Sequence, residues 1–199
     1  MRIAVLYSAM DTRETLVAAA LTVLEQNGAE KFSTRTVCSI ANVTAPTLYH
    51  HFGSADGLLS AAVGEAHRQF LESKKAAIQS SDPVLALAEG WDDFVRFAAE
   101  RPRLYAALMA RLMQGGDIPA FGHGYAQLVE RVEAIAAAGR LAMPVQDAAQ
   151  TAWASANAAS LLHVAAALQV TAALRPPDPS VIDGLRDRAM TAICKPRSK

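Results

Sequence analysis

Cysteine is scarce in this chain, and its scarcity excludes several protein classes. The 199 residues include two cysteines, Cys38 and Cys194, which form neither a disulfide framework nor a metal-binding spacing. We therefore expect a reducing, cytoplasmic location. No apolar run free of charge reaches the roughly 18 residues of a membrane span, so no membrane association is expected. The formal net charge is zero, and composition alone therefore gives no indication of nucleic-acid binding.

Motifs of catalysis and cofactor binding are also missing. The chain has no GxSxG nucleophile elbow, and the glycine-rich stretch 115–124 is not followed by the Lys-Ser/Thr pair of a phosphate-binding loop. The adjacent His50 and His51 would point about 100° apart on a helix, so they cannot easily chelate one ion. The sequence therefore predicts no enzyme, no cofactor and no metal site.

Helical periodicity, in contrast, is present almost everywhere. Apolar residues make up 52% of the chain and recur at spacings of three and four, while strand-like alternation is nearly absent. This predicts an all-α fold of about nine helices. After three short helices ending at residue 53, we expect helices over about 54–79, 83–100, 102–115, 125–138, 145–173 and 179–194, with 115–124 as a loop.

The three short N-terminal helices have recognisable ends and one apolar face each. Gly28 ends the first helix, and Ser33 or Thr34 caps the second. Asn42 tolerates the left-handed backbone of a tight turn, and Thr44 is placed to cap the third helix. On the second helix we expect Val37, Ile40 and Ala41 to face inward and Cys38 to be exposed. On the third, Leu48 and Phe52 are four residues apart and should both pack on the first helix.

A short second helix, a three-residue turn and a third helix form a helix-turn-helix, whose last helix lies in the DNA major groove. Its N-terminal residues, Thr44–Thr47, are suited to base edges: threonine contacts bases or phosphates, and alanine and proline contact a thymine methyl group. Arg35 can read guanine. Tyr49 and His50 lie one to two turns further along, within reach of phosphate, whereas His51 is expected to pack or to approach the backbone edge.

These residues also carry a family resemblance. The stretch FSTRTVCSIANVTAPTLYHHFGSADGLL, residues 32–59, resembles the DNA-binding region of the TetR family of transcriptional regulators. The resemblance implies an N-terminal three-helix helix-turn-helix domain, residues 1–54, and a C-terminal helical ligand-binding and dimerisation domain, residues 55–199. It implies base or phosphate contacts by Thr34, Arg35, Thr44, Ala45, Pro46, Thr47, Tyr49 and His50. Ala55 departs from the family pattern, which often has a phosphate-binding lysine there.

Aromatic and methionine side chains gather in the second half of the chain. They lie on several expected helices with few polar groups among them, which suits either an apolar ligand cavity or an ordinary core. Asn157, one turn after Trp153, and His123 and Tyr125, beside the glycine-rich stretch, would supply convergent polar groups. The predicted ligand-binding residues are therefore Trp91, Phe94, Met109, Met113, His123, Tyr125, Trp153 and Asn157.

The last two expected helices are candidates for a dimer interface. The stretch WASANAASLLHVAAAL is rich in small residues, which let helices approach closely, and the final helix carries an apolar stripe of Ile182, Leu185, Ala189 and Ile193. Together they could form an intermolecular four-helix bundle. A homodimer is also what a helix-turn-helix reader of a pseudo-palindromic operator requires.

We therefore expect a homodimeric repressor that binds double-stranded DNA and releases its operator on binding a small, mostly apolar effector. Two alternatives stay open. One is a DNA-binding protein without an inducer pocket, and the other is a helical interaction protein that no longer binds DNA. Ala55 makes the second conceivable, as does the charge of residues 1–52, which contain four basic and four acidic side chains.

Overall fold

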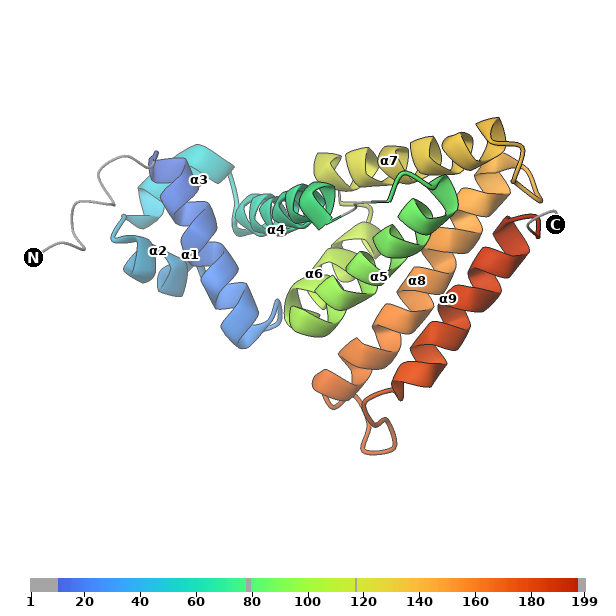
Figure 1. Ribbon diagram of the computed structural model, residues 1–199. Helices are drawn as coiled ribbons and strands as arrows, with labels where there is room; N and C mark the ends of the chain where they lie inside the picture. Colours follow the sequence, from blue (N-terminus) through green and yellow to red (C-terminus); the bar gives the residue numbers. More distant parts are fainter. Residues whose placement is uncertain (1–10, 78–79, 117, 197–199) are drawn as a thin grey trace, which may run out of the picture.

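Helices account for nearly all regular structure in the computed structural model, which describes residues 11–77, 80–116 and 118–196 (Figure 1). This described part contains nine α-helices and no strand, apart from one isolated bridge between Leu141 and Cys194. The predicted all-α fold is therefore confirmed. The helices are α1 (Thr12–Asn27), α2 (Thr34–Ala41), α3 (Ala45–Phe52), α4 (Ala55–Ala77), α5 (Pro83–Glu100), α6 (Pro102–Met113), α7 (Pro119–Ala137), α8 (Val145–Ala167) and α9 (Pro179–Ile193).

Side-chain caps and one left-handed residue separate the first four helices. The Ser33 hydroxyl accepts a hydrogen bond from the Thr36 N–H (3.4 Å), which begins α2. Asn42 ends that helix in the left-handed conformation, with φ of 53°, as the sequence predicts. The Ser54 hydroxyl accepts from the Gly57 N–H (2.9 Å) and begins α4. The turn between α2 and α3 is therefore fixed by local chemistry.

Helices α1–α3 form a small unit at one end of the molecule, and the first half of α4 completes its core (Figure 1). Leu48 of α3 is fully buried there, and Phe52 packs against the same cluster, both as predicted. Leu58, Ala62 and Val63 of α4 are equally buried in it. The head, by which we mean α1–α3, therefore depends on α4 for its core.

The expected orientation of α2 was wrong at two positions. Cys38 is buried, whereas Ile40 is 50% exposed. Val37, Cys38 and Ala41 are separated by one, three and four residues, which places them on one stripe of the helix, and that stripe packs against the core of the head. Ile40 lies outside this stripe, so the apolar surface of α2 continues onto its solvent side.

Two later helices have different bounds from those expected. The stretch 115–124 is not a loop throughout, because α7 begins at Pro119 and includes Gly122 and Gly124. Proline suits the first turn of a helix, and the packing of Phe121 against the core overrides the weak helix propensity of the glycines. Helix α8 ends at Ala167, after which Gln169 adopts a positive φ of 52°. The predicted end of α4, at Gln79, lies outside the described residues.

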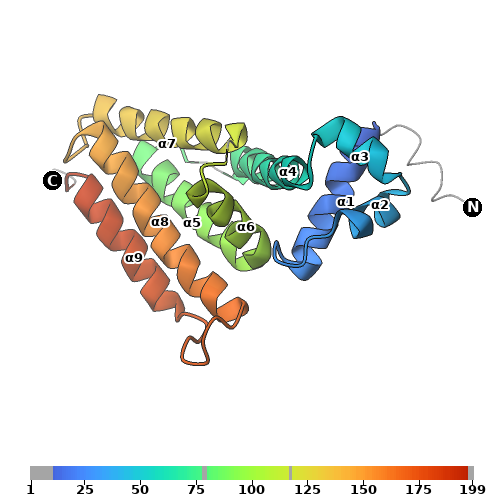
Figure 2. The same ribbon diagram turned by 180° about the vertical axis from the view of Figure 1, so that it is seen from behind.

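Helices α5–α9 form a bundle at the other end of the molecule, and the second half of α4 packs against it (Figure 2). Figures 1 and 2 both show α8 and α9 side by side on the face furthest from the head. The predicted apolar stripe of α9 packs inward: Ala189 and Ile193 are buried, and Ile182 and Leu185 contact the bundle core. Within one chain this stripe therefore packs mainly against the chain's own bundle, with Ile182 and Leu185 half-buried.

Polar contacts also join the head to the bundle through α6. The Arg101 Nε donates to the Glu25 carboxylate of α1 (2.8 Å). The Arg111 guanidinium forms a two-pronged ion pair with Asp56 of α4, with Nη1 2.8 Å from Oδ1, and its Nε donates to the Ser60 hydroxyl (2.8 Å). Helix α6 is therefore anchored to both α1 and α4.

Candidate nucleic-acid interface and apolar pocket

The outer surface of α2 and α3 carries every residue predicted to contact DNA. Six of the eight are exposed, and Thr34 and Thr47 are half-buried. The side chains on the opposite side of the two helices, such as Val37 and Leu48, are fully buried. The apolar face of α3 thus packs against the core of the head, and its polar face is exposed to solvent.

Two threonine hydroxyls meet at the start of α3. Thr44 occupies the N-cap position, but its side chain makes no capping hydrogen bond to the backbone. Its Oγ1 lies 2.9 Å from the Oγ1 of Thr47 instead. Each hydroxyl can donate as well as accept, so this exposed pair can turn toward a base edge or a phosphate without breaking a backbone cap.

The remaining groups on this surface differ in what they can reach. Arg35, at the start of α2, is exposed, and Tyr49 on α3 is 46% exposed. His50 and His51 are both exposed, with ring centroids 5.5 Å apart in an edge-to-face arrangement. The expected packing role of His51 is limited to a tilted contact with Phe52, with centroids 6.2 Å apart.

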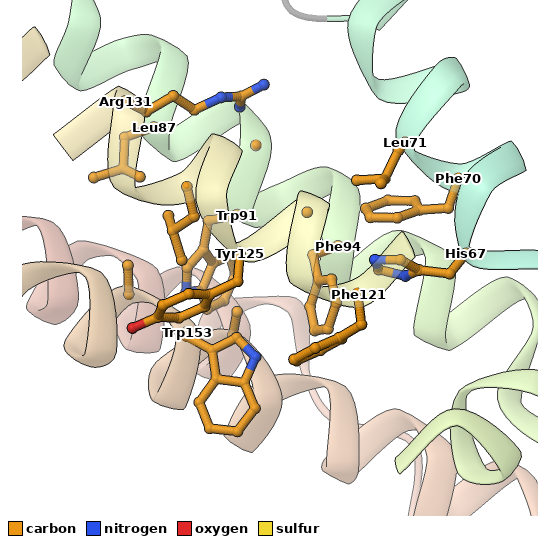
Figure 3. Close-up of a pocket in the computed structure, with 15 residues that line it drawn as sticks. His67, Phe70, Leu71, Leu87, Trp91, Phe94, Phe121, Tyr125, Arg131 and Trp153 are labelled. Carbon is orange, nitrogen blue, oxygen red and sulfur yellow. The ribbon is translucent and has the colours of Figure 1, made fainter. Parts of the chain in front are cut away.

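A pocket opens within the bundle, between α4, α5, α7 and α8 (Figure 3). The space between its side chains, including the part open to solvent, is about 590 Å³. Its walls are mostly aromatic and aliphatic. The lining residues are His67, Phe70, Leu71, Leu87, Gly90, Trp91, Phe94, Phe121, Gly124, Tyr125, Leu128, Arg131, Ala152, Trp153 and Ala156.

Four of the eight residues predicted to bind a ligand line this pocket: Trp91, Phe94, Tyr125 and Trp153. The other four lie elsewhere. Met113 is 76% exposed at the end of α6, and His123 is exposed on α7, where its Nε2 lies 3.0 Å from the Gln127 amide. Met109 packs between two core clusters.

Asn157 has a structural partner rather than a place in the lining. Its Oδ1 accepts a hydrogen bond from the Tyr105 hydroxyl (2.8 Å), and its amide donates to the Trp153 carbonyl (2.7 Å). Burial raises the pKa of Tyr105 to about 12, so this hydroxyl keeps its proton and remains a donor. The predicted polar group of the pocket therefore ties α6 to α8.

Sequence reasoning missed the contributions of α4 and most of those of α7. His67, Phe70 and Leu71 have the three- and four-residue spacing of one helix face, which was a usable signal. Phe121 and Gly124 were hidden because their segment was expected to be a loop. Arg131 gave no sequence signal, since an arginine on a helix is usually solvated.

The polar groups that line the pocket differ in whether they have a hydrogen-bond partner. The Trp91 Nε1 donates to the Ser155 hydroxyl (2.9 Å). The Trp153 Nε1 is buried and has no hydrogen-bond partner among the described residues. Arg131 is half-buried, and burial lowers its pKa, with the nearby Glu89 carboxylate acting in the opposite direction. Its Nη1 makes a long hydrogen bond, 3.4 Å, to the Ala86 carbonyl.

The described part of the chain also lacks a metal-binding cluster and a membrane-spanning helix. No group of three or more His, Cys, Asp or Glu side chains there is arranged to hold a metal ion. No helix in it has both the length and the apolar character needed to cross a membrane.

Comparison with known proteins identifies a family model that matches the N-terminal region and two curated relatives that match less than half of the chain. Residues 16–62 match the family model of bacterial regulatory proteins, tetR family. The HTH-type nicotine-responsive transcriptional repressor HdnoR of Paenarthrobacter nicotinovorans is 32% identical over 81 residues, covering 41% of this chain and 42% of that protein. The HTH-type transcriptional regulatory protein RaaS of Mycobacterium tuberculosis is 32% identical over 97 residues, covering 48% and 43%. The chain thus matches less than half the length of these curated relatives.

Solved structures extend the likeness to the whole fold. A TetR family transcription regulator from Marinobacter aquaeolei VT8 superposes with a TM-score of 0.68 at 16% identity, covering 93% of this chain and 96% of that one. At this identity the match concerns the fold alone. The arrangement of a helix-turn-helix head on a helical bundle is therefore shared over nearly the full length.

Proposed function

The chain belongs to the TetR family of transcriptional regulators, and from this membership we propose that it is a homodimeric repressor of transcription. It binds a pseudo-palindromic operator in double-stranded DNA and releases it when a small, mostly apolar effector enters the pocket. The family is a class of transcription regulators and not of enzymes. Repression requires contact with DNA, which in a bacterial cell implies a cytoplasmic location.

The outer surface of α2 and α3 makes the DNA contact in this proposal. Thr44–Thr47 face base edges in the major groove, and Arg35 is suited to guanine. Tyr49 and His50 contact phosphate. The exposure of these side chains, above a face that is buried in the head, supports these roles. Ala55 supplies no charge to the backbone, so the salt dependence of binding should be shallower by about one unit than with a lysine there.

One observation carries the link between effector and operator: α4 belongs to both parts of the molecule. Its first half contributes Leu58 and Val63 to the core of the head, and its second half contributes His67 and Phe70 to the pocket lining. A ligand that displaces the second half therefore acts on the helix that supports α1 and α3. We keep the division into residues 1–54 and 55–199 as a functional one, with α4 as the connection.

The effector lowers operator affinity only if it binds the non-repressing conformation better. A coupling of about 1–3 kcal/mol is typical for such sites. Because two heads are joined in a dimer, a change in the spacing of the recognition helices from about 34–36 Å would affect both half-sites together.

A dimer interface on α8 and α9 fits the exposed residues of these helices better than the inward-facing stripe. Ala158 and Leu161 of α8 are exposed, Leu161 to 59%, and Val181 of α9 is 47% exposed beside the half-buried Gly184. Small residues among apolar ones permit close helix approach across a two-fold axis.

The proposal is tested by selecting binding sites from random double-stranded DNA with the purified protein. We expect a palindromic site that is bound in a salt-sensitive way. Arg35→Ala should relax the preference at one position in each half-site and cost about 1–3 kcal/mol, whereas Tyr49→Phe should weaken all sites more evenly. Failure to enrich any sequence, with the protein folded and dimeric, would favour a helical interaction protein that does not bind DNA.

The effector part of the proposal has its own measurement. A library of small apolar compounds is screened for a rise in the melting temperature of the protein, because a ligand that binds only the folded state stabilises it. Compounds that raise the melting temperature should also cause the protein to release the selected operator in a gel-shift assay. Operator binding without a single stabilising compound would leave a ligand-independent DNA-binding protein as the better description.

A further inference from the structure

The pocket has a chemical character that narrows the effector class, and the inference from it rests on the proposed function. Both tryptophans of the chain and three of its six phenylalanines line the pocket. Their rings meet at angles: Phe70 and Phe94 are 5.8 Å apart at 70°, and Phe121 and Trp153 are 6.4 Å apart at 79°. Walls of crossed rings offer both faces and edges to a flat ring between them.

The polar groups of the lining favour hydrogen-bond acceptors on the ligand. The Trp153 Nε1–H can only donate, and it is buried without an acceptor. Arg131 likewise carries donors only, and its hydrogen bond to Ala86 occupies one of them. None of the described residues that line the pocket is acidic. A ligand cation would therefore find no carboxylate inside, while an acceptor would find two donor side chains.

The position of Arg131 indicates which end of the pocket would hold a charged group of the ligand. Figure 3 shows Arg131 beside Leu87 at one end of the pocket and His67 with Phe70 and Leu71 at the other, with the aromatic side chains between them. Arg131 is half-buried, and burial lowers its pKa, as expected for a cation with reduced hydration. Glu89 offsets this electrostatically, but its Oε2 also accepts from the Ser80 N–H (3.3 Å).

We propose that the pocket is selective for planar aromatic carboxylates over amines of the same shape. The ring lies among Trp91, Phe94, Phe121, Tyr125 and Trp153, and the carboxylate pairs with the Arg131 guanidinium at the Leu87 end. An arginine suits this role because its planar fork binds a carboxylate through two parallel hydrogen bonds.

Three probes with one ring system and different charge test the selectivity: 1-naphthylacetate, 1-methylnaphthalene and 1-naphthylmethylamine. Quenching of tryptophan fluorescence in the full-length protein reports binding, because both tryptophans line the pocket. We expect naphthylacetate to bind about tenfold or more tightly than the amine, as a partly desolvated charge pair should give. Equal affinities, a preference for the amine, or no quenching by any probe would overturn the selectivity.

Two variants assign the selectivity to Arg131. Arg131→Gln should abolish the preference for the acid over the amine while leaving the affinity for 1-methylnaphthalene within about twofold, since the aromatic walls remain. Arg175→Gln removes the same charge from an exposed loop between α8 and α9 and should leave the preference intact. If Arg131→Gln does not fold, the probe series on the unaltered protein still decides.

The test of ligand selectivity and the test of the proposed function can fail independently of each other. Site selection on DNA judges repression and uses no ligand, whereas the fluorescence series uses no DNA. A protein that selects an operator but binds the amine as well as the acid remains a regulator with a different effector class.

Discussion

Gly122 and Gly124 are two residues apart on α7, yet they have opposite surroundings. A Cβ on Gly122 would meet no atom within 4 Å. A Cβ on Gly124 would lie 2.8 Å from the His67 Nε2 and 3.2 Å from the Leu71 Cδ2. His67 is itself only 3% exposed, so its ring has little room to move away. Gly124 therefore sets how closely α7 approaches α4 beside the pocket.

This contrast predicts opposite effects of the same substitution. Gly124→Ala should destabilise the protein by about 1–3 kcal/mol, because the added methyl group overpacks the contact with α4. Gly122→Ala should stabilise it by up to about 1 kcal/mol, because alanine is the better helix former and the position is open. Urea unfolding of both variants gives the two values. Equal effects of the two substitutions would mean that Gly124 is not a point of close packing.

Cys38 and Ile40 show why single residues are harder to predict than helices. Hydrophobicity indicated that Ile40 should be inside and Cys38 outside, but the structure reverses both. On an eight-residue helix the apolar side chains cover more than the buried face, and the neighbouring helices decide which of them are buried. The sequence of α2 alone does not contain the position of those neighbours.

At the scale of elements, the ion pair between Arg111 and Asp56 connects α6 to the beginning of α4. The Arg111 side chain is 16% exposed, and its guanidinium contacts both carboxylate oxygens of Asp56 as well as the Ser60 hydroxyl. Two-pronged geometry and partial burial make such a pair stronger than a typical surface ion pair.

A double-mutant cycle measures this connection. Arg111→Gln and Asp56→Asn together should cost less than the sum of the single substitutions, with a coupling of about 1 kcal/mol. The more exposed pair of Arg68 and Glu72 within α4, which is joined by a single contact, is the control, and its coupling should stay below about 0.5 kcal/mol. Additive costs at Arg111 and Asp56 would show that the pair does not join the two helices energetically.

Helix existence was largely predictable, whereas helix bounds depended on context. Ser33, Asn42 and Ser54 mark ends by local hydrogen bonds or backbone preference, and the structure has those ends where the sequence predicts them. The start of α7 was not predictable in this way, because glycines usually indicate a loop. There, the packing of Phe121 and Gly124 against α4 decides, and such long-range contacts leave no local pattern.

The pocket was predictable in part for the same reason. Trp91, Phe94 and Trp153 are large residues on long, clearly periodic helices, so their clustering could be expected. Asn157 could not be assigned correctly, because its partner, Tyr105, lies 52 residues away on another helix.

At the scale of the whole molecule, repression in this proposal requires two copies of the chain. Ala158→Arg places a long charged side chain on the exposed face of α8 and should convert the dimer to monomers, because small residues are needed for close helix approach. Light scattering measures the mass of the variant in solution, which should fall to that of a monomer. The affinity for the operator should fall as well. Gln169→Arg, at the exposed turn after α8, is the control. A dimer that survives Ala158→Arg would place the interface elsewhere.

The sharing of α4 also has a consequence for recombination among related regulators. A crossover just after residue 54 would pair a new head with a foreign Leu58, Ala62 and Val63, all of which belong to the head's own core. A crossover between Val63 and His67 keeps Leu58, Ala62 and Val63 with their own head and leaves the pocket lining intact, so that only the contacts of the head core with α6, such as Leu104 and Leu108, change partner. Chimeras joined in that interval should fold, and evolution could exchange operator and effector specificity there by a single cut inside one helix.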